Sequence, residues 1–110
     1  MIRETLATDS ANAFVGLENT YGLDFQARFS TFGTTYQGTG SLSAPYWLKL
    51  VRSGSSFSAY SSTDGSTWTQ FGSTITISMD TNAYIGLAVT SEANGQVTTA
   101  TFANVTITSP

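Results

Sequence analysis

The sequence predicts an all-β fold, an antiparallel sandwich or barrel, from three observations. Apolar and polar residues alternate through most segments, which is the period-two pattern of half-buried strands. Gly, Asn and Asp separate these segments at short intervals, as expected for turns. Ser and Thr account for 15 and 19 of the 110 residues, and strong helix formers are few. A chain of this length without a linker or charge block predicts one domain over residues 1–110.

The N-terminal part carries the clearest alternation. A short extended stretch, Met1–Leu6, is followed by a turn and then by a predicted strand, Asn12–Glu18. After a polar break the alternation resumes at Leu23 and continues to Phe29, with apolar residues at the odd positions. These segments predict a hairpin with one apolar face.

The middle of the chain combines a stretch without any period and a run of short strands. Thr31–Pro45 contains three Gly and a Pro, and it is predicted to be a long loop that could contribute Tyr36 to a binding site. The strands that follow are joined by turns at Ser53-Gly54-Ser55 and Asp64-Gly65, because Gly supplies the positive φ of tight hairpins. They are Tyr46–Val51, Phe57–Ser61 and Trp68–Phe71.

The C-terminal third is expected to add further strands, for a total of eight or nine. They are Thr74–Ser78, Asn82–Thr90 and Thr98–Thr108, with a turn at Asn94-Gly95 and a bulge near Ala103-Asn104 that would bring Phe102 into phase with the rest of its strand. The predicted core consists of the apolar residues on the inward face of each strand: Val15, Leu17, Leu23, Phe25, Phe29, Leu48, Leu50, Phe57, Ile75, Ile77, Ile85, Leu87, Val89, Phe102, Val105 and Ile107.

Charge and composition exclude several classes of function. The net charge is −3, which is the wrong sign for binding nucleic acid or anionic lipid. The chain has no Cys and no His, so disulfides, thiolate metal sites and Ser-His or Cys-His hydrolases are excluded. No apolar run approaches the roughly 20 residues of a membrane span, and the first residues lack a signal-peptide pattern. No membrane insertion is expected, and a signal for export would have to lie outside this sequence.

Four stretches together resemble the concanavalin A-like lectin and glucanase superfamily, which includes laminin-G-like domains. They are Met1–Glu4; Asn12–Gly16; Tyr46–Arg52 with Phe57, Tyr60 and Ser62–Trp68; and Tyr84–Ser91 with Thr101–Thr106. The order of these stretches is similar to the later part of a bacterial domain sometimes labelled "regulation of enolase". The resemblance implies a jelly-roll sandwich, an extracellular or cell-surface location, and a role in binding carbohydrate.

The same resemblance implies that the first strands of the family fold are lacking. In that family the Met1–Glu4 stretch lies after several earlier strands. Met1–Leu6 is therefore expected beside an unpaired sheet edge, and such edges recruit strands from neighbouring molecules. This predicts a homo-oligomer with the N-terminal strand at or near the interface.

Polar and aromatic residues that project from strands opposite the apolar rows are the candidate binding residues. Carbohydrate sites combine aromatic rings that stack on sugar faces with polar groups that bond to hydroxyls. The tentative carbohydrate-binding set is Gln26, Arg28, Trp47, Lys49 and Tyr84, expected to line one groove. The alternative is a solvated outer face with ordinary ion pairs between strand cations and the acids Glu4, Glu18 and Asp24.

No catalytic residue, metal or cofactor is predicted. Acids alternating on one strand, the pattern of the hydrolases in this superfamily, do not occur. Asp64, or Asp80 with Asn82, could offer oxygen ligands to calcium, but Asp and Asn in turns more often bond to the local backbone. The predicted function is a non-catalytic extracellular carbohydrate-binding or adhesion module. The alternative is a self-assembling structural subunit, an oligomer or fibre, joined through strand edges.

Overall fold

A computed structural model describes residues 1–18, 22–29, 34–38 and 45–109, with backbone only for 34–38. The described residues form eight strands and no helix. None of them therefore belongs to a helix long and apolar enough to cross a membrane. The strands are β1 (Ile2–Arg3), β2 (Asn12–Glu18), β3 (Gly22–Arg28), β4 (Thr34–Gly38), β5 (Trp47–Ser53), β6 (Ser56–Ser62), β7 (Thr69–Thr76) and β8 (Tyr84–Ile85).

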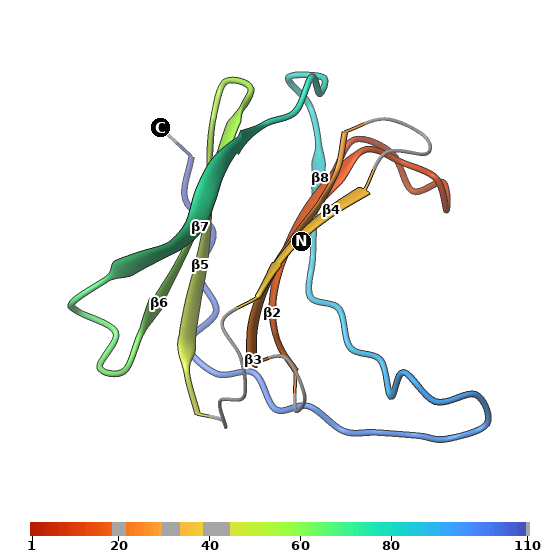
Figure 1. The fold of residues 1–110 in the computed structure, drawn as a ribbon, viewed down its shortest axis with the longest axis vertical. Coiled ribbons are helices and arrows are strands. Elements are labelled where there is room, and N and C mark those ends of the chain that lie inside the picture. The colour runs from red at the N-terminus through yellow and green to blue at the C-terminus, as the bar shows by residue number, and fades with distance from the viewer. Residues whose placement is uncertain (19–21, 30–33, 39–44, 110) are drawn as a thin grey trace.

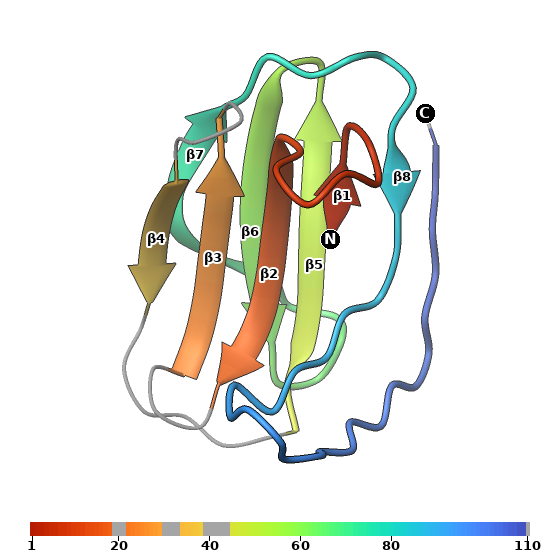
Figure 2. The ribbon, with the colours of Figure 1, turned by 90° about the vertical axis from the view of Figure 1, so that its right-hand side faces the viewer.

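The strands make two packed antiparallel sheets, so the predicted sandwich is confirmed. Sheet A has the order β4-β3-β2-β1-β8, and sheet B has the order β5-β6-β7. Figure 1 shows the two layers from the side, and Figure 2 shows sheet A in front of sheet B.

The predicted N-terminal hairpin is confirmed in detail. Across β2 and β3, Val15 lies opposite Phe25 and Ala13 opposite Ala27, so apolar residues pair on one face. Phe25, with its side chain fully buried, meets Phe57 of sheet B in a common core. The hairpin alternation therefore identifies the packed face correctly.

The middle of the chain differs from its prediction at two places. The expected loop Thr31–Pro45 contains the edge strand β4, which pairs with β3 through Arg28 opposite Thr34 and the residues beyond. An edge strand needs a partner on one side only, so it can form without an apolar alternation. The two strands expected at 68–71 and 74–78 form one strand, β7, whose register with β6 shifts between Phe57 and Ala59. Gly72 in β7 has a φ of +69°, as in a bulge.

The C-terminal third contradicts its prediction. Of the two strands expected at Asn82–Thr90 and Thr98–Thr108, only Tyr84–Ile85 pairs with another strand, β1. Beyond Gly86, which still bonds to Met1, the chain swings out past one end of the sandwich and returns at the level of sheet B (Figure 1). Alternation makes an extended conformation favourable, but a strand also needs a partner for its backbone groups.

The core is correspondingly smaller than predicted. The predicted core residues on β2, β3, β5, β6 and β7, together with Ile77, are buried or partly buried, and Ala13, Ala59 and Met79 join them. Seven predicted core residues are exposed instead: Phe29, Ile85, Leu87, Val89, Phe102, Val105 and Ile107. Phe29 follows the end of β3, Ile85 lies on the edge strand β8, and the other five belong to residues 86–109, which form no strand.

Candidate functional site

The structure divides the predicted carbohydrate-binding residues between the two outer faces of the sandwich. Gln26 and Arg28 alternate with the buried Phe25 and Ala27 on β3, so they lie on the outer face of sheet A. Tyr84 joins them, because it lies opposite Arg3 while its neighbour Ile85 lies opposite the buried Ile2. Trp47 and Lys49 flank the inward Leu48 on β5, so they lie on the outer face of sheet B. The five residues are not brought into one groove.

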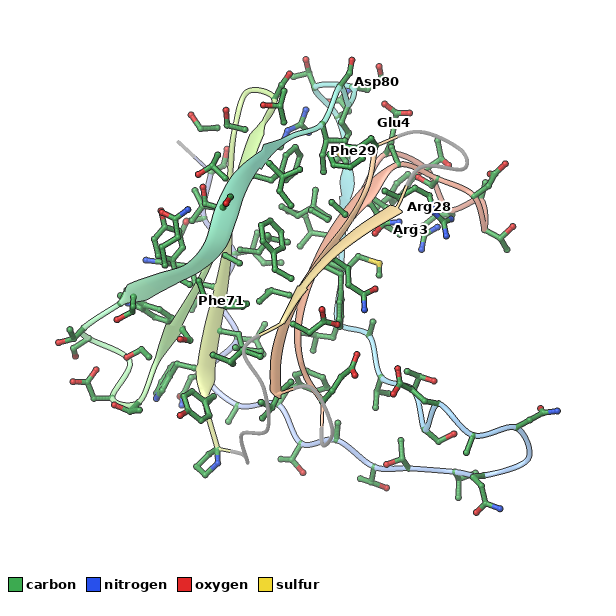
Figure 3. The ribbon with its side chains drawn as sticks, viewed as in Figure 1. Arg3, Glu4, Arg28, Phe29, Phe71 and Asp80 are labelled. Carbon is green, nitrogen blue, oxygen red and sulfur yellow. The ribbon has the colours of Figure 1, made fainter. Side chains whose placement is uncertain are left out.

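On the outer face of sheet A, two arginines hold a turn against the sheet. Arg28 Nη1 donates to the Thr8 carbonyl oxygen at 2.7 Å, and Arg3 Nε donates to the Thr5 carbonyl oxygen at 3.0 Å. Arg3 Nη2 also donates to the Ala7 carbonyl oxygen. Both side chains lie on the side of sheet A that faces away from sheet B (Figure 3). These guanidinium groups have a structural role in holding residues 5–8.

Gln26, on the same face, is hydrogen-bonded to the buried carboxyl group of Asp24. Gln26 Nε2 donates to Asp24 Oδ2 at 2.6 Å, and the Asp24 side chain is fully buried. Asp24 Oδ1 has no hydrogen-bond partner among the described residues. Burial, followed by the neighbouring Glu18 carboxyl group, raises the pKa of Asp24 to about 7. Of the predicted residues on this face, Tyr84 is the one that presents an exposed ring.

The outer face of sheet B carries a cluster of aromatic rings around one cation. Lys49 lies opposite Tyr60 in the register of β5 and β6. Its Nζ is 4.8 Å from the centre of the Tyr60 ring and 4.5 Å from the centre of the Trp68 ring. Both distances are within the range of cation–π attraction, which fixes the ammonium group between two π faces.

Trp47 is held at the end of this cluster by the turn between β6 and β7. Gly65 in that turn has a φ of +77°, and a Cβ built there would lie 2.8 Å from Trp47 Cε2. The backbone of Gly65 therefore packs directly against the indole ring. The exposed fraction of Trp47 is 36%, so part of the ring remains open to solvent.

A network of hydrogen bonds fixes this turn. Asp64 Oδ1 accepts from the backbone amides of Ser66 at 2.8 Å and Thr67 at 2.9 Å, and from Ser62 Oγ at 2.8 Å. Ser62 Oγ in turn accepts from the Gly65 amide at 2.9 Å. These bonds lower the pKa of Asp64 to about 2, with the Thr67 amide as the largest cause. Asp64 therefore organises the turn that supports Trp47.

The exposed part of Trp47 borders a hollow of about 270 Å³. Hydroxyl and amide side chains line it together with the indole ring of Trp47 and the phenol ring of Tyr46. Its lining residues are Pro45, Tyr46, Trp47, Thr63, Thr101, Ala103 and Asn104. The hollow thus combines rings with neutral hydrogen-bonding groups, and none of the described residues that line it is charged.

A second hollow, of about 420 Å³, lies at the end of the sandwich where the chain crosses from sheet B to β8. Glu4, Asp9 and Phe29 are among its lining residues. Glu4 Oε2 accepts from the backbone amide of Asp80 at 2.8 Å, and Figure 3 shows these two residues near each other. The described residues include no group of three or more acidic side chains placed to hold a metal ion.

Sequence reasoning missed the roles of Tyr60 and Trp68 beside Lys49. The signal was present in the two-residue turn Gly54-Ser55, because the turn sets Ser53 opposite Ser56. Counting outward from that pair places Lys49 opposite Tyr60. The hollow beside Trp47 has no such signal, since it joins β5 to residues more than 50 positions later in the chain.

The geometry defines this chain as an all-β sandwich with an aromatic outer face on its smaller sheet. Comparisons with protein-family models, with curated proteins and with solved structures found no match to this chain. The resemblance to the concanavalin A-like superfamily is therefore neither supported nor opposed by these comparisons.

Proposed function

We propose that this protein is a non-catalytic carbohydrate-binding or adhesion module that acts outside the cell or on its surface. The observation that carries the proposal is the hollow beside Trp47, where a partly exposed indole ring meets neutral hydroxyl and amide groups. Aromatic rings offer sugars an apolar platform, and neutral polar groups bond to sugar hydroxyls without the cost of desolvating a charge.

The preorganisation of Trp47 supports the same function. The ring is packed against Gly65, and the turn around Gly65 is fixed by Asp64 and Ser62. A ligand that stacks on this ring does not need to order it first, which reduces the entropy cost of binding. Lys49, held between Tyr60 and Trp68, extends the surface along sheet B and suits neutral or weakly acidic chains.

The affinity should be weak. One or two stacked rings in a shallow hollow correspond to dissociation constants nearer millimolar than nanomolar, on the order of −4 to −6 kcal/mol. Binding of this strength is useful where a polymer offers many repeats or a larger protein carries several modules.

Affinity electrophoresis in gels that contain neutral glucans or a weakly acidic polygalacturonan tests the proposal. The wild type should be retarded by at least one polymer, and Trp47→Ala should lose most of that retardation because it removes the platform. Tyr84→Ala is the matched control, since it removes an exposed ring from the opposite outer face. Wild type that migrates freely in every gel, or retardation that depends on Tyr84 and not on Trp47, would contradict the proposed site.

A second candidate function, a self-assembling structural subunit, is favoured by a different observation. Residues 81–110 contain a single charged residue, Glu92, and six large apolar side chains exposed between Ile85 and Ile107 were expected in a core. Exposed apolar residues without nearby charges are typical of surfaces that associate.

A further inference from the structure

The free edge of sheet A at β8 has a backbone that is ready to accept another strand. In the order β4-β3-β2-β1-β8, β8 is the outermost strand, whereas β1 is paired on both sides. The N-terminal strand therefore lies next to the free edge, as the sequence predicted, but does not itself form that edge. The edge is formed by β8, and the residues that follow Gly86 have no strand partner in the single chain.

The direction of the backbone groups along this edge follows from two hydrogen bonds. The Gly86 amide donates to the Met1 carbonyl oxygen at 3.1 Å, and the Met1 amino group donates to the Gly86 carbonyl oxygen at 3.1 Å. Gly86 thus directs its backbone groups toward β1. Because these directions alternate along a strand, Ile85 directs its groups away from β1, to the free edge. A strand that continues through residue 90 would direct those of Leu87 and Val89 to the same edge.

The side chains along this edge lack the features that prevent association. Ile85, Leu87 and Val89 alternate along the sequence and are 53%, 60% and 58% exposed. Thr81–Ser91 contains no charged residue and no proline. Native edges are usually protected by charges, proline or bulges, and sheet B has Lys49 and Arg52 on its edge strand β5 and an irregular register at β7.

We propose that residues 84–90 pair with the same residues of a second copy of this chain, antiparallel and around a two-fold axis at Leu87. In this register Leu87 lies opposite its own counterpart, and Ile85 lies opposite the counterpart of Val89. Pairing extends β8 through residue 90, and each of these pairs then exchanges two backbone hydrogen bonds, because all three residues direct their amide and carbonyl groups to the shared edge. The two copies of sheet A become one continuous sheet.

Three features of the segment make a second copy the occupant. Its apolar pattern is symmetric about Leu87, so two copies match each other in the antiparallel orientation that a two-fold axis requires. Its lack of charge lets two chains of net charge −3 approach there without local repulsion. The returning segment, residues 101–109, lies at the level of sheet B (Figure 1) and on the β8 side of the molecule (Figure 2), and it carries the exposed Phe102, Val105 and Ile107. The two-fold axis brings two such segments to the same side of the continuous sheet.

This inference rests on the second candidate function, the self-assembling subunit. Two proline variants test whether this edge forms the interface, separately from whether the chain assembles at all. Leu87→Pro removes an amide that points to the partner, whereas Ala88→Pro, the matched control, removes an amide that points the other way. Light scattering coupled to size exclusion should give a dimer for the wild type and for Ala88→Pro, and a monomer for Leu87→Pro. Circular dichroism on all three should show the same β-sheet signal.

Different results would contradict assembly itself and the β8 edge as its interface. A wild type that is monomeric at concentrations up to about 1 mM overturns assembly itself. A dimer that survives Leu87→Pro overturns this edge as the interface, and a wild type that grows into fibres overturns the closed two-fold pair.

Amide hydrogen exchange on the wild type gives a test that needs no variant. The amides of Ile85, Leu87 and Val89 should become more protected as the concentration rises, while the amide of Ala88 should not. Protection that is independent of concentration, or that lacks this alternation, overturns the proposed register.

Discussion

Residues 1–79 and residues 80–109 follow the same rule in sequence and differ in packing. Both alternate apolar and polar residues, and both have turns that contain Gly at positive φ. In the first region the alternating residues Phe25 and Phe57 are fully buried, whereas in the second Leu87 and Ile107 are mostly exposed. The difference shows that alternation determines which residues share a face, while a partner strand and an opposing sheet determine whether that face is buried.

The largest expected effect compares one buried and one exposed apolar residue of the two regions. Phe25→Ala should reduce the free energy of unfolding by about 3–5 kcal/mol, because it leaves a cavity between the sheets. Leu87→Ala should cost less than about 1 kcal/mol, since Leu87 is 60% exposed in the single chain. Urea unfolding at low protein concentration, where the chain is monomeric, measures both. Similar losses for the two variants would show that residues 86–90 are packed in solution as the sequence first suggested.

A smaller effect compares two glycines with nearly the same backbone conformation. Gly65 has a φ of +77° and Gly95 a φ of +76°, but Gly65 touches the Trp47 ring and Gly95 has open space around it. Both Gly→Ala changes should cost about 1–2 kcal/mol for the left-handed backbone. Gly65→Ala should cost more and should alter the near-ultraviolet dichroism of the indole, because its Cβ overlaps the ring. An unchanged indole signal in Gly65→Ala would mean that Trp47 is not held by this turn.

A further effect, which depends on pH, concerns the buried carboxyl group of Asp24. Its pKa is about 7 in the folded protein and 3.8 for an ordinary Asp, so the folded state binds the proton more tightly. The stability that this provides is fully present below about pH 4 and is lost as the pH rises toward and through 7. Asp24→Asn, which cannot ionise, should be more stable than the wild type at pH 8 by roughly 1–3 kcal/mol and should show a flatter pH profile. Urea unfolding between pH 4 and pH 8 gives the profiles.

The same pH experiment also tests where Glu92, which belongs to residues 80–109, lies relative to Asp24. Its charge is among the causes that raise the pKa of Asp24, and it lies in the turn at residues 91–95. Glu92→Gln should therefore move the pH transition slightly downward, and Glu18→Gln should move it further because Glu18 is the larger cause. No movement in Glu92→Gln would indicate that the turn lies farther from sheet A than in this structure.

The sequence by itself determined the all-β class, the antiparallel pairing and most of the packed face in residues 1–79. These features depend on local physics: alternation assigns residues such as Phe25 and Ile77 to one side, and Gly54 and Gly65 allow the tight turns. The two-residue length of the turn at Gly54 also determines the register of β5 and β6, which places Lys49 opposite Tyr60.

Only the tertiary structure decided which strand lies at an edge, which alternating segment lacks a partner, and which binding candidates come together. Trp47 and Gln26 are separated by the thickness of the sandwich, although both project from strands opposite apolar rows. The hollow beside Trp47 depends on Thr101 and Asn104, which are distant in sequence. The physical reason is that hydrogen-bond partners and opposing layers are supplied by residues far along the chain, so a local pattern cannot specify them.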